Sequence, residues 1–219
     1  MRYLGLALFA EGPTDYYFLR PLLQRLCEDI CAREARASVE VSEVLGLDDP
    51  DNERRSRAER IALSAEMAKG AWNILFIHTD GANDIRRARA QLIQPGIDLV
   101  RREMGEEVAS VGVVPVRETE AWVIVDGDAL RCAFGTELSD IELGLPVIRD
   151  VEAVVDPKSV LQRAFNATNP SNRRLRQGIS PYLNTLGEQV SLNSLRDLSS
   201  FRLLEDEICA ALRGLGFLR

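Results

Sequence analysis

The sequence predicts an α/β protein in which a parallel sheet of about four strands is flanked by helices, with a helical appendage at the C-terminal end. In residues 1–128, short apolar runs alternate with longer stretches whose apolar residues recur at helical spacing. This alternation is typical of parallel sheets, because each crossover between parallel strands needs a helix. Residues 129–219 contain helical stretches but no further strand pair, so we expect them to pack on the α/β core as a helical extension.

The strands of this core are expected at four short apolar runs: residues 3–10, 39–47, 72–78 and 108–116. The expected helices follow at 16–35, about 53–69 and about 84–104, and in the extension at 128–134, 157–166, 175–186 and 192–215. Thr14 or Asp15 is the expected cap of the first helix, since each side chain can accept a hydrogen bond from a free amide of the first turn. Pro21 lies inside that helix and is expected to kink it or to displace its start.

Composition places the chain among ordinary soluble globular proteins. It has 219 residues, of which 46% are hydrophobic and 28% charged. The apolar N-terminal run is too short to span a membrane, which takes about 20 residues, and it lacks the layout of a signal peptide. The four cysteines are scattered without a paired motif, so we interpret them as reduced thiols of a cytoplasmic protein. The net charge of −7 argues against binding nucleic acid over the whole surface, but it permits an acidic metal site.

The first candidate motif is the turn EGPTD, in which Glu11 ends the first strand and Asp15 begins the first helix. Both carboxylates can face one crevice at the carboxyl edge of the sheet, where ligands of open parallel sheets bind. Magnesium prefers such oxygen ligands. We expect Gly12 to allow a sharp reversal of the chain and close approach of a phosphate. The alternative is a plain strand-to-helix turn in which Asp15 only caps the helix.

The second motif is HTDGAND, where Asp80 leaves the most apolar strand. We interpret Asp80 as a metal ligand. Asp84 is a further candidate ligand, although its position before IRRARAQL also suits a helix cap. His78 shares the side of Asp80 by strand alternation and is either a supporting group or a half-buried sheet residue.

The third motif is VPVRETEAW, in which Glu118 and Glu120 follow the fourth strand and point the same way if the chain is extended. At least one of them is expected to bind metal. The alternative is a helix start at which Thr119 or Glu118 occupies the first turn and Trp122 packs inward.

Together, a Glu after the first strand, an Asp after the third and a Glu after the fourth resemble the TOPRIM fold, the metal-binding module of topoisomerases, primases and overcoming-lysogenization-defect nucleases. EGPTD resembles the EGxTD signature of the nuclease branch, HTDGAND its DxD element, and RETEAWVIVD a stretch of small TOPRIM-like proteins of unknown function. One departure is Ala82, which stands where the second Asp of DxD would fall. Asp84 or Asn83 are the possible substitutes.

This resemblance implies a nuclease that uses Mg²⁺ or Mn²⁺ to hydrolyse DNA or RNA, with Glu11, Asp80 and Glu120 as catalytic residues. Its metal ligands would be Glu11, Asp15, Asp80, Asp84, Glu118 and Glu120. The resemblance further implies an antiviral defence system with a separate ATPase subunit. The alternative is a catalytically degenerate TOPRIM-like regulatory or binding subunit, which Ala82 favours. A homo-oligomer is left open.

A basic cluster in the extension is the candidate contact for phosphates. The segment NPSNRRLRQG carries Arg173, Arg174 and Arg176, has few acidic neighbours and is expected to open a helix. The alternative for these arginines is a solvated helix face.

Overall fold

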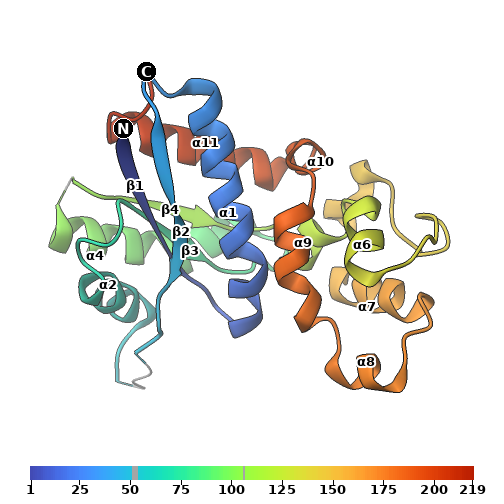
Figure 1. The fold of residues 1–219 in the computed structure, drawn as a ribbon. Helices are drawn as coiled ribbons and strands as arrows, with labels where there is room; N and C mark the ends of the chain where they lie inside the picture. The colour runs from blue at the N-terminus through green and yellow to red at the C-terminus, as the bar shows by residue number, and fades with distance from the viewer. Residues whose placement is uncertain (51–53, 106) are drawn as a thin grey trace.

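The structure is a computed structural model that describes residues 1–50, 54–105 and 107–219. It confirms the α/β fold, with one four-stranded, all-parallel sheet flanked by helices in a Rossmann-like arrangement (Figure 1). The strand order is β2-β1-β3-β4. The strands are β1 Arg2–Phe9, β2 Val39–Gly46, β3 Ile74–His78 and β4 Ala109–Val113.

The two faces of the sheet are buried in separate cores. On β1, Leu4, Leu6 and Leu8 belong to one core, and Ala7 and Phe9 to the other, because successive side chains of a strand point to opposite faces. The first core is covered by α1 Pro13–Glu34 and by helices of the extension. The second is covered by α2 Arg57–Met67 and α4 Gln94–Met104. All four strands therefore direct their carboxyl ends to one edge between these layers.

The start of α1 differs from the expectation. Its N-cap is Gly12, not Thr14 or Asp15, because Pro13 has the fixed φ that suits the first helical position. Asp15 lies in the first turn and accepts a hydrogen bond from the amide of Gly12 at 2.9 Å. Gly12 has a φ of −126°, so it makes no left-handed turn, although an added Cβ would come within 3.2 Å of Asp15 Oδ2. Pro21 lies within the continuous helix and does not displace its start.

The helix expected at 84–104 is divided into three parts. A short α-helix, Ile85–Ala88 (α3), and a stretch of π-helix, Arg89–Ile93 (η1), precede α4. Pro95 explains the irregular part, because it has no amide hydrogen to donate to the preceding turn. Helix α2 begins at Arg57 with Ser56 as its cap, whereas Glu53, the expected start, lies outside the described residues.

The extension is more segmented than the sequence suggests. It follows the short α5 (Glu120–Val123) and consists of the helices α6 Gly127–Phe134, η2 Ile148–Ala153, α7 Pro157–Ala167, α8 Asn172–Gln177, η3 Ser180–Tyr182, α9 Leu183–Gln189, α10 Leu192–Arg196 and α11 Ser199–Gly214. Gly178, with a φ of +66°, ends α8 inside the helix expected at 175–186. Extended backbone at Leu198 separates α10 from α11 inside the one expected at 192–215.

Contacts with β4, with α1 and with the start of β1 hold this extension in place. Helix α11 lies along β4, and α9 lies along α1 (Figure 1). The Trp122 indole donates to Ser200 Oγ at 3.0 Å and its ring meets Phe201 edge-on. Arg2 at the start of β1 donates to the carbonyls of Leu215 and Gly216. The extension thus shares a core with the sheet.

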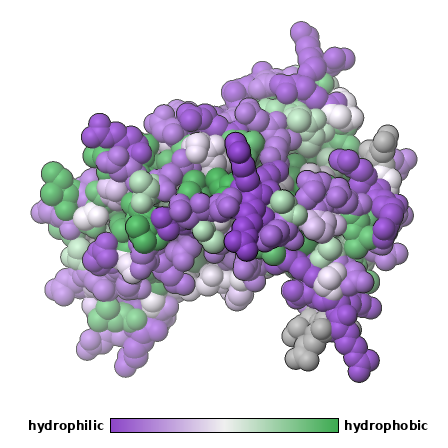
Figure 2. Space-filling model, turned by 180° about the vertical axis from the view of Figure 1, so that it is seen from behind, coloured by the Kyte–Doolittle hydropathy of each residue, from purple (hydrophilic) through white to green (hydrophobic). Residues whose placement is uncertain are grey.

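The surface seen from behind is mainly hydrophilic, with apolar side chains scattered between polar ones (Figure 2). Within the described ranges, no helix combines the length and the apolar character that a membrane span requires.

Candidate functional site

The acidic residues predicted at the strand ends converge at the carboxyl edge of the sheet. We call Glu11, Asp15, Asp80, Glu118 and Glu120 the acidic rim. Glu11 follows β1, Asp15 lies in the first turn of α1, and Asp80 follows β3. After β4, Glu118 precedes α5 and Glu120 is its first residue. The charges of the other four all act on Asp80. The rim therefore brings together side chains that are more than 100 positions apart in the sequence.

Glu11 is held in place by the segment that follows β3. Its Oε2 accepts a hydrogen bond from Thr79 Oγ1 at 2.7 Å and a longer one from the Asp80 amide at 3.3 Å. Burial raises the pKa of Glu11, but these hydrogen bonds and the charge of Arg57 outweigh it, so its pKa lies below the usual value. Glu11 is thus an ionised carboxylate with a fixed orientation.

Asp15 lies beside a buried histidine at the end of β3. His78, which is fully buried, has its Nδ1 3.5 Å from Asp15 Oδ2 and its Nε2 3.6 Å from Asp80 Oδ1. Thr119 Oγ1 lies 3.0 Å from His78 Nε2 and donates to Asp15 Oδ1 at 3.3 Å. Burial lowers the pKa of His78, and the charges of Asp15 and Glu11 oppose this effect. The ring is linked to Asp15 through the hydroxyl of Thr119.

Asp80 carries the largest perturbation in the rim. Burial, followed by repulsion from Asp15, Glu11, Glu120 and Glu118, raises the pKa of Asp80 to about 7. Burial and the charge of Glu118 likewise raise the pKa of Glu120, although a backbone hydrogen bond and Lys158 oppose them. Strongly perturbed carboxyls that share a crevice are a physical signature of functional sites. A nearby cation would relieve this repulsion.

Several polar groups at the rim have no hydrogen-bond partner. Buried atoms without one, within the described ranges, are Arg57 Nε, His78 Nδ1, Arg117 Nε and Glu118 Oε2. Buried polar atoms are almost always satisfied in folded proteins, so each such atom calls for an explanation. A ligand bound at the rim would explain the unpartnered Oε2 of Glu118.

Arg57 lies at the rim although it is not among the predicted site residues, and the backbone of Arg117 lies beside the loop that follows β3. Arg57, at the start of α2, donates to the carbonyl of His78 at 2.6 Å and its charge acts on Glu11. The carbonyl of Arg117 accepts from the amide of Ala82 at 3.4 Å. Arg57 belongs to a run of arginines in the sequence, but only its position beside β3 distinguishes it from the others.

Asp84 acts as a helix cap, because its Oδ1 accepts from the amide of Arg87 at 3.0 Å. This confirms its expected capping position, and its part in metal binding stays a prediction. The preceding loop lies close to the end of β4, since a Cβ on Gly81 would lie 2.2 Å from the Pro115 carbonyl. Ala82 and Asn83 have φ values of +45° and +70°. An aspartate at 82 would therefore have to adopt a left-handed conformation.

The arginine cluster lies on α8, at the outer end of the extension (Figure 1). Arg174 is occupied internally: it donates to the Phe134 carbonyl and the Tyr182 hydroxyl, both at 2.7 Å, and lies over the Phe165 ring. Arg173 and Arg176 are exposed. Of the three candidates for phosphate contact, Arg174 thus has a clear structural role.

The carboxylate oxygens of the rim are suitable ligands for a divalent cation. The rim offers the carboxylate oxygens that Mg²⁺ and Mn²⁺ prefer, an unpartnered Glu118 oxygen, and mutual repulsion that a cation would offset. Among the described residues, however, no three His, Cys, Asp or Glu side chains are already arranged to hold a metal ion. The chemistry of the donors nevertheless fits a divalent cation.

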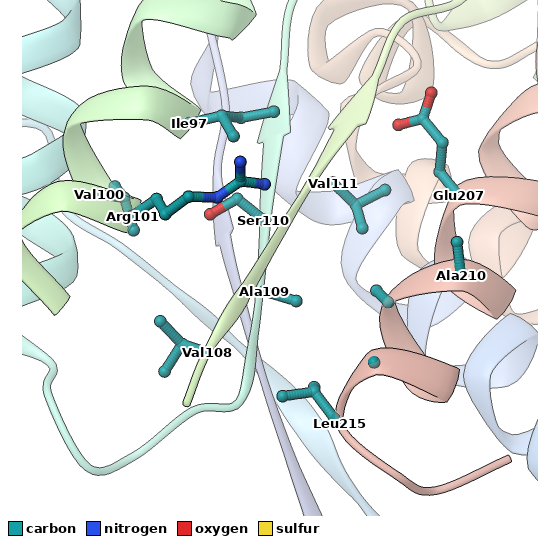
Figure 3. Close-up of a pocket in the computed structure, with 12 residues that line it drawn as sticks. Ile97, Val100, Arg101, Val108, Ala109, Ser110, Val111, Glu207, Ala210 and Leu215 are labelled. Atoms are coloured by element: carbon teal, nitrogen blue, oxygen red, sulfur yellow. The ribbon is translucent and has the colours of Figure 1, made fainter. Parts of the chain in front are cut away.

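A hollow of about 510 Å³ lies away from the rim, over the start of edge strand β4 between α4 and α11 (Figure 3). Ile97 and Arg101 of α4 face it on one side, and Glu207 and Ala210 of α11 on the other (Figure 3). It contains none of the predicted site residues. We therefore assign the candidate site to the rim on chemical grounds and not to this hollow.

Comparison of the chain with protein-family models, curated proteins and solved structures finds no match. The candidate site consequently depends on its own geometry and on the motifs at the strand ends.

The raised pKa of Asp80 predicts a pH-dependent stability. In the unfolded chain the pKa of Asp80 is near 3.8, whereas in the folded protein it is about 7. Between these two pH values the folded protein keeps a proton on Asp80 that the unfolded chain has lost. The free energy of unfolding therefore loses this contribution as the pH rises from about 4 to 7. Metal-free Asp80→Asn should be more stable than wild type at pH 8, by at most roughly 1 kcal/mol given solvent screening of this 43% exposed side chain.

Urea denaturation in EDTA at pH 5 and pH 8 measures this difference. The stabilisation by the asparagine should shrink at pH 5. An equal change at both pH values would contradict the raised pKa of Asp80.

Proposed function

We propose that the chain is a divalent-metal-dependent nuclease that hydrolyses phosphodiester bonds at the acidic rim. The observation that carries the proposal is the convergence of carboxylates from the ends of β1, β3 and β4, where burial and then repulsion from its neighbours raise the pKa of Asp80 to about 7. Such an arrangement costs stability in the free protein. A cation and a phosphate at the same place would offset that cost.

The rim residues would divide the work of holding the metal. Glu11, Asp80 and Glu120 are the proposed catalytic carboxylates. Asp15 and Glu118 are the further metal ligands at the rim, and Asp84 remains an additional candidate ligand. Bound Mg²⁺ or Mn²⁺ would activate a water and stabilise the charge on the reacting phosphate. Thr79 orients Glu11 through its hydrogen bond, and Thr119 orients Asp15. His78 is the proposed positioning residue, because its Nε2 bonds the hydroxyl of Thr119, which in turn donates to Asp15.

Nucleic acid is the proposed substrate. Because the net charge is −7, phosphate binding must depend on local positive groups. Arg57, whose charge acts on Glu11, is the proposed phosphate contact at the rim, and the exposed Arg173 and Arg176 on α8 are further candidates. By its resemblance to TOPRIM nucleases, the chain would act in the cytoplasm within a defence system that includes a separate ATPase subunit. Its reduced cysteines suit that compartment.

Glu11→Gln tests the metal site directly. This change keeps the shape of the side chain but removes its charge, so Mn²⁺ binding should weaken by about 10-fold or more in titration calorimetry, the scale of altering a metal's immediate surroundings. Glu142→Gln is a matched control, because Glu142 only bonds Ser139 in the extension. Identical isotherms for wild type and Glu11→Gln would remove Glu11 from the ligand set.

A catalytically degenerate regulatory subunit is the second candidate. It is favoured by Ala82 and by the lack, in the described ranges, of a ready arrangement of three metal ligands. Wild-type protein that binds neither Mn²⁺ nor Mg²⁺ and leaves single- and double-stranded DNA and RNA intact would select this candidate.

A further inference from the structure

A pocket of about 430 Å³ opens directly beside Glu11, between the start of α1 and the end of β2. Its walls include Glu11, the side chains of Tyr16, Tyr17 and Arg20 on α1, and Asp48 after β2. This volume lies within the range of small-ligand pockets, about 300–1,000 Å³. Because Glu11 belongs both to the pocket and to the acidic rim, a group bound in the pocket lies next to the proposed reacting centre.

Tyr17 stands between this pocket and a second hollow. The second hollow measures about 220 Å³, and Tyr16, Tyr17 and Arg20 line both. Tyr16 is fixed, since its hydroxyl donates to the Leu47 carbonyl at 2.7 Å and accepts from the Ala10 amide. Tyr17, by contrast, is 53% exposed. Its ring is therefore accessible to a flat group entering from the solvent.

The charges of the pocket distinguish between the parts of a nucleotide. Among the described residues that line it, Glu11, Asp48 and Asp49 carry carboxylates and Arg20 is the one cation. Arg20 donates through Nε to the Val44 carbonyl. A phosphate would be repelled by the carboxylates. A neutral, flat base whose amino groups can donate to a carboxylate suits both the walls and the exposed ring.

We propose that this pocket binds the base of a nucleotide adjacent to the scissile phosphate, that Tyr17 stacks on that base, and that the substrate is therefore single-stranded nucleic acid. The proposal rests on the nuclease function proposed above. In a duplex, both faces of a base are covered by neighbouring pairs, so a paired base would have to leave the stack before it could reach Tyr17. A single strand carries no such cost.

Fluorescence anisotropy with a short labelled single strand and its duplex, with Ca²⁺ in place of Mg²⁺, tests the pocket. Tyr17→Ala should weaken binding of the single strand by about 5- to 150-fold, the range that corresponds to losing one base–aromatic stack. Tyr17→Phe keeps the ring and should retain wild-type affinity. Tyr3→Ala is the matched control, because Tyr3 is 58% exposed but lies at the amino end of β1, away from the rim. The duplex should bind more weakly than the single strand.

The outcomes separate this inference from the proposed function. If wild type cuts nucleic acid and Tyr17→Ala binds and cuts single strands equally well, the nuclease stands and the base pocket is wrong. Loss of affinity that is equal in Tyr17→Ala and Tyr3→Ala, or equal binding of duplex and single strand, also overturns the pocket. Wild type that neither binds nor cuts any of the nucleic acids overturns both proposals.

Discussion

Asp80→Asn should reduce metal-dependent cleavage of nucleic acid by about 10²-fold or more, the scale of removing one group that acts directly in the reaction. Asp80 lies just after β3, and the charges of all four other rim residues raise the pKa of its carboxyl group. Asparagine keeps the size of the side chain but removes the negative charge that would bind a cation. Initial rates with Mg²⁺ and with Mn²⁺, on single- and double-stranded substrates, measure the effect.

Asp84→Asn is the companion variant that decides whether Asp84 only caps a helix or also binds metal. Asp84 is four residues further along and caps α3, and asparagine is an equally good cap. Its cleavage rate should stay close to that of wild type if its role is confined to capping. A rate loss equal to that of Asp80→Asn would instead make Asp84 a metal ligand, and unchanged cleavage by Asp80→Asn would remove the central residue of the proposed site.

Trp122→Ala should lower the free energy of unfolding by about 3–5 kcal/mol, the usual cost of deleting a large buried aromatic side chain. The Trp122 ring is fully buried, packs edge-on against Phe201 of α11, and donates to Ser200. The variant would leave a cavity between α5 and the extension and a buried hydroxyl with one fewer partner. Urea denaturation followed by far-UV circular dichroism measures the change.

Trp122→Phe provides the comparison, because it keeps most of the ring but loses the hydrogen bond, so it should lose less stability than alanine. Since the extension and the sheet share one core, both variants should unfold in a single transition. Two separate transitions, with only the second near the wild-type midpoint, would show that the extension folds as an independent unit.

The predicted positions of the strands and of the acidic residues followed from local pattern. Apolar runs ending in Glu11 and Asp80 indicated strands directed to one edge, and the parallel sheet places those ends together. Helix ends were less predictable, because Pro95 and Leu198 interrupt helical patterns through backbone effects that side-chain periodicity does not report. Gly12 caps α1 in place of Thr14 or Asp15 because the backbone of Pro13 suits the first helical position, which is likewise a backbone effect.

The sequence by itself determined the α/β class and the chemistry available at the strand ends, since hydrophobic periodicity and carboxylate side chains are local properties. Only the tertiary structure decided which charges interact. It brought buried His78 between Asp15 and Asp80, placed Arg57 beside Glu11, and paired Arg174 with groups inside the extension. These outcomes depend on distances between residues far apart in the chain, and electrostatic and hydrogen-bond energies vary steeply with such distances.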